Sequence, residues 1–119
     1  MKRASRVALH LEREVLPRGN VERGPSPRAL ENAVDLLSAM AHPARLRVLL
    51  ALCRRGPQSA GVLATLCGLE QSAASHQLRV LRDARLVESQ RDGKRIIYRL
   101  VDEHVAQIVE DAVAHAAES

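Results

Sequence analysis

Residues 59–100 read SAGVLATLCGLEQSAASHQLRVLRDARLVESQRDGKRIIYRL, and this stretch decides the fold. Two helical patterns, over residues 59–68 and 71–84, are separated by a short turn that contains glycine. That arrangement is typical of a helix-turn-helix, whose second helix enters the major groove of DNA. In the second helix the apolar spacing predicts a buried side of Ala74, Leu78 and Leu81. The opposite side carries the candidate DNA-contacting residues Ser72, Ser75, His76, Gln77 and Arg79, although an ordinary exposed helix face would look similar.

The segment after these helices predicts a β-hairpin. Residues 86–90 and 95–101 are rich in strand-forming residues, and the Asp-Gly pair between them is a strong hairpin signal. We expect Leu86, Ile97 and Val101 to face the core. The tip presents Arg91, Lys94 and Arg95 as candidates for contact with DNA phosphates. A basic hairpin directly after a recognition helix is the wing of a winged helix-turn-helix, so the predicted fold is mainly α with a β-hairpin wing.

Proline, glycine and serine predict where the preceding helices begin and end. Ser26 and Pro27 open a helix whose apolar side is Leu30, Val34, Leu37 and Met40. Pro43 opens the next helix, which ends at Gly56-Pro57 and has as its inner side Leu46, Leu49, Leu50 and Cys53. Ser59 caps a short third helix with apolar residues Val62, Leu63 and Leu66. Residues 1–28 are expected to form a partly flexible arm and linker, with a short helix over residues 5–16, and residues 29–119 the winged helix-turn-helix domain.

Residues 102–119 predict a C-terminal amphipathic helix with Asp102 as its N-cap. Its apolar stripe consists of Val105, Ile108, Val109, Ala112, Val113 and Ala116. The stripe has no other evident cover in a chain of 119 residues, which is too short to bury a large core alone. We therefore expect a homodimer in which two copies of this helix pack together.

Four side chains that can bind a metal lie at the two ends of this helix: Asp102 and His104, then His115 and Glu118. His104 and His115 are about 16.5 Å apart along the helix axis, whereas zinc–nitrogen bonds are about 2.0–2.1 Å long. One helix therefore cannot close a four-ligand site on itself. Two antiparallel helices can, because the first pair of one chain then meets the second pair of the other. The pattern predicts two interchain Zn²⁺ sites per dimer, and merely solvated helix ends are the alternative.

Composition and charge exclude several classes of function. Tyr98 is the single aromatic residue, which argues against RNA recognition by base stacking. Seven basic and three acidic residues lie within residues 79–99, whereas residues 102–119 hold five acidic residues and no Lys or Arg. A basic segment beside an acidic one suits a double-stranded DNA surface next to a cation site.

Several further motifs are missing from the sequence. It has no zinc-hydrolase motif and no glycine-rich phosphate loop, and neighbours such as Ser75 and His76 point apart on a helix, so we expect no enzyme. No run reaches transmembrane length and no secretory signal is evident, so we expect a cytoplasmic protein without a membrane partner. Cys53 and Cys67 fit buried, reduced thiols, and a disulfide between them is the alternative.

Three segments together resemble the ArsR/SmtB family of metal-responsive bacterial repressors: AHPARLR at residues 41–47, QSAASHQLRVLR at 71–82 and RDGKRIIYRL at 91–100. The ending, with Asp102, His104, His115 and Glu118, is similar to the zinc-sensing site on the C-terminal helix of that family. The resemblance implies an apo dimer that occupies an operator and is released by metal, which derepresses metal efflux or storage genes. Relatives that sense soft metals use cysteine pairs in the third helix, where this chain has Gln58-Ser-Ala-Gly61.

Other functions remain open at this point. Four nitrogen and oxygen ligands suit tetrahedral zinc, but Co²⁺ or Ni²⁺ could also bind, and His10 could serve as an accessory ligand. A nickel or cobalt sensor of the same family is therefore one alternative. A metal-blind winged-helix regulator is another, and a zinc-buffering dimer without operator specificity is a third.

Overall fold

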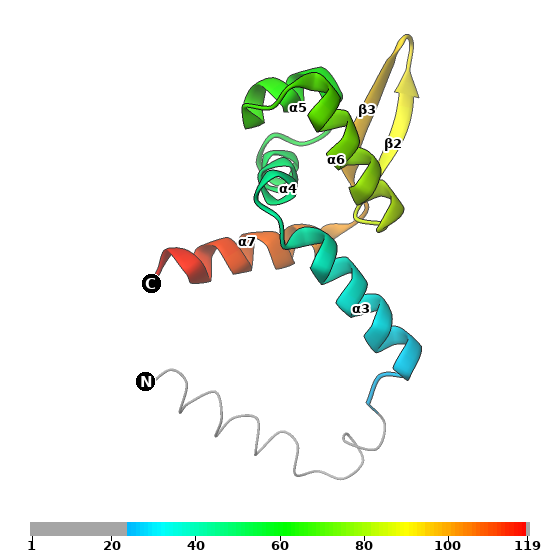
Figure 1. Cartoon of the computed structure of the whole chain (residues 1–119), viewed down its shortest axis with the longest axis vertical. Helices are drawn as coiled ribbons and strands as arrows, with labels where there is room; N and C mark the ends of the chain where they lie inside the picture. Colours follow the sequence, from blue (N-terminus) through cyan, green and yellow to red (C-terminus); the bar gives the residue numbers. More distant parts are fainter. Residues whose placement is uncertain (1–23, 119) are drawn as a thin grey trace. The chain divides into compact units, whose positions relative to one another are not determined.

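The structure, a computed structural model, describes residues 24–118. Its elements are α3 (Pro27–Met40), α4 (Pro43–Arg55), β1 (Gln58–Ser59), α5 (Ala60–Cys67), α6 (Gln71–Asp83), β2 (Val87–Asp92), β3 (Arg95–Leu100) and α7 (Glu103–Ala117) (Figure 1). This is the predicted winged helix-turn-helix, mainly helical with a small antiparallel sheet. The expected helix over residues 5–16 and the candidate ligand His10 lie outside the described residues.

Contacts divide the chain into two units, Met1–Asn32 and Ala33–Ser119. The described part of the first unit is residues 24–32, which contain the start of α3. There the Ala29 amide donates a hydrogen bond to Ser26 Oγ over 3.1 Å, so Ser26 caps the helix as predicted.

Local signals also set the helix ends in the second unit. The Val62 amide donates to Ser59 Oγ over 3.4 Å at the start of α5, and the Val105 amide donates to Asp102 Oδ1 over 3.2 Å at the start of α7. Gly68 ends α5 in the left-handed conformation, with φ of 66°, where a Cβ would be strained. These caps are the ones that the sequence predicts.

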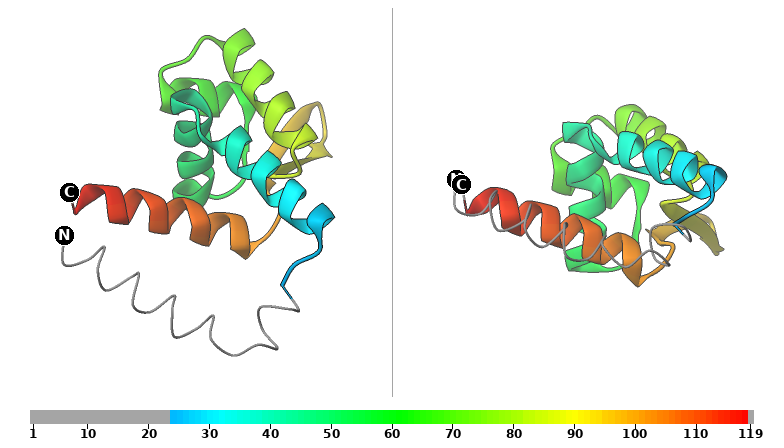
Figure 2. Two further views of the ribbon diagram at one scale, coloured as in Figure 1. Left: turned by 60° about the horizontal axis from the view of Figure 1, so that its bottom comes forward. Right: turned by 90° about the horizontal axis from the view of Figure 1, so that it is seen from below.

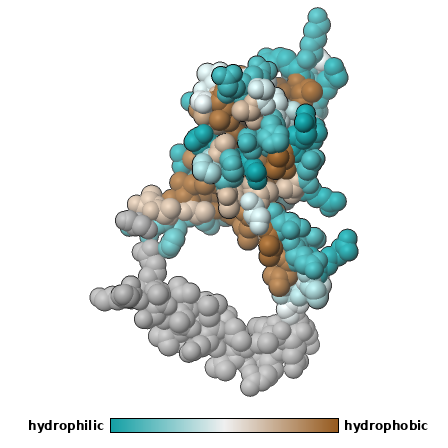
Figure 3. Space-filling model, in the orientation of Figure 1, coloured by the Kyte–Doolittle hydropathy of each residue, from teal (hydrophilic) through white to brown (hydrophobic). Residues whose placement is uncertain are grey.

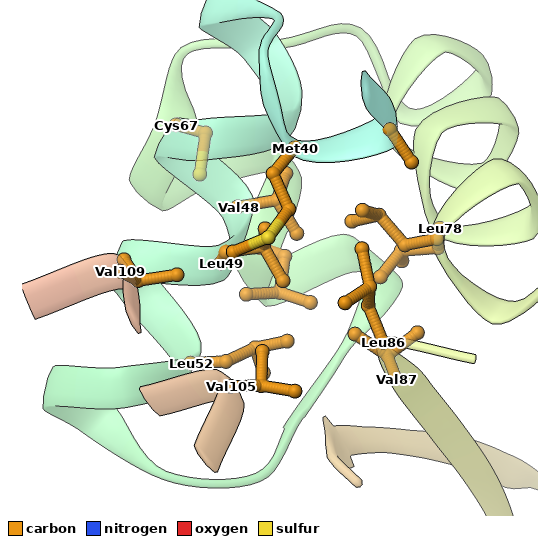
Figure 4. Packing of buried hydrophobic residues seen from close by; sticks show 13 residues of the cluster. Met40, Val48, Leu49, Leu52, Cys67, Leu78, Leu86, Val87, Val105 and Val109 are labelled. Carbon is orange, nitrogen blue, oxygen red and sulfur yellow. The ribbon is translucent and has the colours of Figure 1, made fainter. Parts of the chain in front are cut away.

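The core of the second unit forms around α4, which packs against α5, α6, α7 and β3 (Figure 4). Because neighbours surround α4 on several sides, its buried residues are Val48, Leu49 and Leu52. Of the predicted inner residues, Leu49 is fully buried, whereas Leu46, Leu50 and Cys53 are only half-buried. The helix is buried over a different arc than its leucine spacing suggested.

Helix α5 corrects a second prediction. Val62 and Leu66 are 37% and 38% exposed, and the buried residues of this helix are Leu63, Ala64 and Cys67. The expected apolar side was therefore right only for Leu63.

Within residues 24–118, no single helix is long and apolar enough to cross a membrane. Helices α3 and α4 reach the length and composition of a membrane span only when they are taken together as a bent pair.

The sheet has the strand order β1-β3-β2, with all pairs antiparallel. Asp92 pairs with Arg95, so the turn is Gly93-Lys94 and β2 ends two residues later than predicted. Strand β1 was not predicted. The expected core position of Ile97 is wrong, because Tyr98 and Leu100 pack against the core and alternate residues of a strand face opposite sides.

The first half of α7 packs against α4, which corrects the predicted dimer face. Val105 and Val109 are 6% and 0% exposed and belong to the protomer core. The chain thus covers two residues that were expected to need a second copy. Ile108 remains 38% exposed, and Ala112 and Ala116 are exposed as well. The three views together show the last turns of α7 extending beyond α4 (Figures 1 and 2).

Candidate nucleic-acid interface and metal ligands

Helix α6 is fixed to the core by Ala74, Leu78 and Leu81, all of which are 0% exposed. This confirms the predicted buried side and points the other side outward. The five candidate contact residues of α6 differ in how exposed they are. Ser72, His76 and Arg79 are exposed, whereas Ser75 and Gln77 are half-buried on its two flanks.

Gln77 is held from α4 by a residue that the sequence did not single out. Arg45 Nε donates a hydrogen bond to Gln77 Oε1 over 2.9 Å, and Arg45 Nη1 donates to the Ala39 carbonyl oxygen over 3.1 Å. Arg45 and Gln77 are 32 residues apart in the chain, so no local pattern could predict their contact.

Ser75, on the other flank of α6, faces the wing. It lines an open hollow of about 430 Å³ together with Gly61 of α5 and with Lys94 and Arg95 of the hairpin. A hydroxyl group and two cationic side chains beside an open hollow are groups that bind phosphate oxygens. Of the predicted residues, the structure therefore brings Ser75 of the helix and Lys94 and Arg95 of the wing to one surface.

Arg91 and Arg99 of the hairpin have partners within it. Arg91 Nε donates to the Gly93 carbonyl oxygen over 3.3 Å and braces the turn. Arg99 Nε pairs with Glu88 Oε2 across the strands at 2.7 Å. Lys94 and Arg95 are exposed at the tip, and neither appears in an ion pair among the described residues. They are the hairpin's cations best placed for an external anion.

The candidate metal ligands lie at the two ends of α7. His104 Nδ1 is 3.6 Å from Asp102 Oδ1, and 92% of the His104 side chain is exposed. His115 is exposed in the last turn and Glu118 is the C-cap residue. Within the described residues, no group of three or more His, Cys, Asp or Glu side chains could hold a metal ion. One protomer thus assembles the first predicted pair without bringing it to the second.

Both cysteines are free thiols. Burial raises the pKa of the Cys53 thiol, and the nearby Glu110 carboxylate raises it further. Burial likewise raises the pKa of Cys67, which is 8% exposed. A thiol must lose its proton to bind a metal, so these environments disfavour a thiolate site. The interpretation as reduced thiols is confirmed, although Cys53 is half-buried rather than buried.

Comparison with known proteins places the fold in a family. A model described as a helix-turn-helix domain matches residues 40–90. The HTH-type transcriptional regulator NmtR of Mycobacterium tuberculosis is 46% identical over 89 residues, which cover 75% of this chain and 73% of that protein. The chain belongs to the ArsR/SmtB family of winged helix-turn-helix transcriptional regulators. Membership of the ArsR/SmtB family makes it a transcriptional regulator and not an enzyme, as the sequence predicted.

Solved structures of similar proteins agree with this assignment. The homodimeric winged helix-turn-helix DNA-binding domain of a possible ArsR-family regulator from Mycobacterium bovis has a TM-score of 0.71 and 31% identity, covering 81% of this chain and 91% of that one. The AntR antimony-specific transcriptional repressor has a TM-score of 0.72 and 32% identity, covering 87% of this chain and 94% of that one.

Proposed function

We propose that this ArsR/SmtB-family chain is a metal-responsive repressor whose apo homodimer binds operator DNA and is released by zinc. The observation that carries the proposal is the position of two ligand pairs at opposite ends of one helix, on a protomer whose α6 and wing share a basic surface. Release would derepress genes for metal efflux or storage.

The DNA-binding half of the proposal rests on α6 and the wing. Ser72, His76 and Arg79 are exposed along a helix of 13 residues, which is long enough to follow a major groove. Lys94 and Arg95 beside Ser75 then contact the neighbouring phosphates, with Arg91 at the turn and Gln77 at the other flank of α6. Phosphate contacts fix the position of the protein, and the helix reads the bases.

The dimer rests on apolar surface that the chain leaves exposed. On α3, Leu30, Val34 and Leu37 lie on one helix face and are 57%, 55% and 51% exposed (Figure 3). Ile108 of α7 is 38% exposed beside the buried Val109. Rows of exposed apolar residues on a small protein mark interfaces, and the Mycobacterium bovis relative is homodimeric. A second copy of this chain is the partner that we propose for α3 and α7.

The metal half rests on ligand chemistry. Asp102 and His104 supply an oxygen and a nitrogen near each other, and His115 and Glu118 supply the same pair one helical turn apart. An antiparallel α7 pair across a dyad brings the two pairs together twice. Each resulting N₂O₂ site fits tetrahedral zinc, and Co²⁺ and Ni²⁺ are the competing ions. Zinc bound there would fix how the two protomers are oriented.

Direct binding to DNA tests the repressor and the metal together. A fluorescent duplex taken from the promoter of the chain's own gene is titrated with purified apo protein, then with protein loaded with zinc, cobalt or nickel. We expect tight binding of the apo dimer and release by zinc at the lowest concentration. Equal binding with and without every metal would show a metal-blind regulator, and binding without preference over random DNA would leave only a zinc-buffering dimer.

Mixed dimers test whether ligands are shared between chains. A His104→Ala protomer combined with a His115→Ala protomer gives one site that lacks both histidines and one intact site. Each mutant homodimer has two damaged sites. We therefore expect one tight zinc per mixed dimer, which neither parent binds. Zinc binding no better than that of the parents would show that the ligands are not shared across a dyad.

A further inference from the structure

The contact between Arg45 and Gln77 fixes the chemical group that Gln77 can present to DNA. Arginine only donates hydrogen bonds, so the atom 2.9 Å from Arg45 Nε has to be the amide oxygen of Gln77. The usual ambiguity between the oxygen and nitrogen of a glutamine amide therefore does not arise here. Both side chains are half-buried, so this hydrogen bond is partly shielded from water.

Arg45 is itself held in place. Its Nη1 donates to the Ala39 carbonyl oxygen at the end of α3 over 3.1 Å, while its Nε reaches Gln77. One guanidinium thus joins the end of α3, the start of α4 and the flank of the recognition helix. With two of its donors engaged at fixed positions, Arg45 cannot swing away from Gln77 without breaking the contact to Ala39 as well.

The geometry of an amide gives this contact a consequence. The oxygen and nitrogen of the Gln77 side chain lie on opposite arms of one plane, so an oxygen that points at α4 leaves the NH₂ group pointing away from it. Recognition of adenine by glutamine needs both arms, because the oxygen accepts from the N6 amino group while the nitrogen donates to N7. In this chain the contact with Arg45 turns the oxygen toward α4, so only the nitrogen arm is left to face a base.

We propose that Gln77 is a donor-only reader that selects guanine over adenine in the major groove, and that Arg45 is the residue that sets this selectivity. Guanine offers two adjacent acceptors, N7 and O6, which an NH₂ group can satisfy. Adenine offers N7 beside an amino group that would face the Gln77 amino group donor to donor. Arg45 acts through Gln77, as a positioning residue. The inference rests on the proposed role of α6 in operator reading.

Selection from a library of random duplexes tests the idea without knowing the operator. The wild-type protein and the Gln77→Ala variant are each used to enrich duplexes, and the position whose preference disappears in the variant is the one that Gln77 reads. Affinity is then measured for the enriched duplex and for the same duplex with guanine replaced by adenine at that position. We expect the wild-type protein to favour guanine by about tenfold.

Three further variants separate the role of Arg45 from that of its charge and test the donor of Gln77. In Arg45→Ala the Gln77 oxygen is released, so the ratio of guanine to adenine affinity is expected to fall to about one. Arg47→Ala removes the same charge from the same helix at an exposed position, and we expect the wild-type ratio. Gln77→Glu keeps an acceptor for Arg45 but loses the donor, so the preference for guanine should vanish while the melting temperature does not fall.

Each result decides between the inference and the proposed function. If Arg45→Ala keeps the wild-type ratio while Gln77→Ala abolishes it, the positioning role is wrong and reading by α6 stands. An adenine preference in the wild-type protein, or no position that depends on Gln77, also overturns the inference. Failure of the wild-type protein to enrich any sequence refutes the proposed function itself. Should Arg45→Ala not fold, Gln77→Glu decides alone, because a retained guanine preference contradicts a donor-only reader.

Discussion

Replacing Val109 by alanine tests whether α7 belongs first to the protomer core. Val109 is 0% exposed and shares the core cluster with Leu49, Leu52 and Val105. The change removes two methyl groups, each worth about 0.8 kcal/mol on burial, and it leaves a cavity whose lining loses contacts. We expect unfolding to cost about 2–3 kcal/mol less, which is a large share of the roughly 5–15 kcal/mol typical of a domain.

Urea unfolding at two protein concentrations separates a core effect from an interface effect. Loss of a core contact lowers the stability of the protomer by the same amount at both concentrations. Loss of an interface contact lowers stability only where the dimer is populated, so its effect shrinks on dilution. Ile108→Ala is the matched control, because Ile108 lies next to Val109 on α7 and is 38% exposed. We expect a smaller effect there that depends on concentration. A Val109→Ala defect that disappears on dilution would refute the placement of Val109 in the core.

Four other changes are predicted from the described contacts. Arg85 has φ of 64° without being glycine, so Arg85→Gly should raise stability by about 1 kcal/mol, seen as a higher melting temperature. Lys94→Ala should weaken binding to all DNA sequences alike and reduce the slope of log affinity against log salt by about one. Asp102→Asn should keep the α7 cap and lower only zinc affinity, whereas Asp102→Ala should also destabilise the helix by about 1 kcal/mol in urea unfolding. Because the pKa values of Cys53 and Cys67 are raised, iodoacetamide should alkylate both more slowly in the native protein than in the urea-unfolded chain, as mass spectrometry can follow.

The sequence predicted those features that depend on neighbours in the chain. Ser26, Ser59 and Asp102 cap helices because a short polar side chain can accept from an amide three residues ahead. The hairpin at Asp92-Gly93 and the buried side of α6 follow from turn chemistry and from helical periodicity in the same way. These signals lie within a few residues, and the structure confirms them.

Features that depend on distant partners could not be predicted in this way. Strand β1 has two residues and exists only because Gln58 and Ser59 pair with β3. The sequence places Val109 in the dimer interface, because no residue near it in the chain indicates that α4 covers it. Arg45 is one arginine in a helix with several, and its role becomes visible only through Gln77. Each of these contacts joins segments more than 30 residues apart.

The position of the candidate ligands Asp102 and His104 would let a metal act on DNA binding without reshaping the protomer. Asp102 follows the end of β3 by two residues, and the Val101 amide donates to the Leu86 carbonyl oxygen over 3.1 Å, which ties the end of the wing to its base. Immediately afterwards α7 is fixed to α4 through Val105 and Val109.

The wing, the recognition helix and the start of α7 are therefore joined in one packed unit. In the proposed dimer, an ion held by Asp102 and by the partner's last turn would turn that unit as a whole relative to its partner. Two reading heads must match successive major grooves at once, so a change in their relative orientation costs binding energy at both half-sites. A coupling of about 1–3 kcal/mol is typical of allosteric proteins. That is small compared with the energy needed to disrupt either core, which is why regulation through the dimer geometry is physically the easier route.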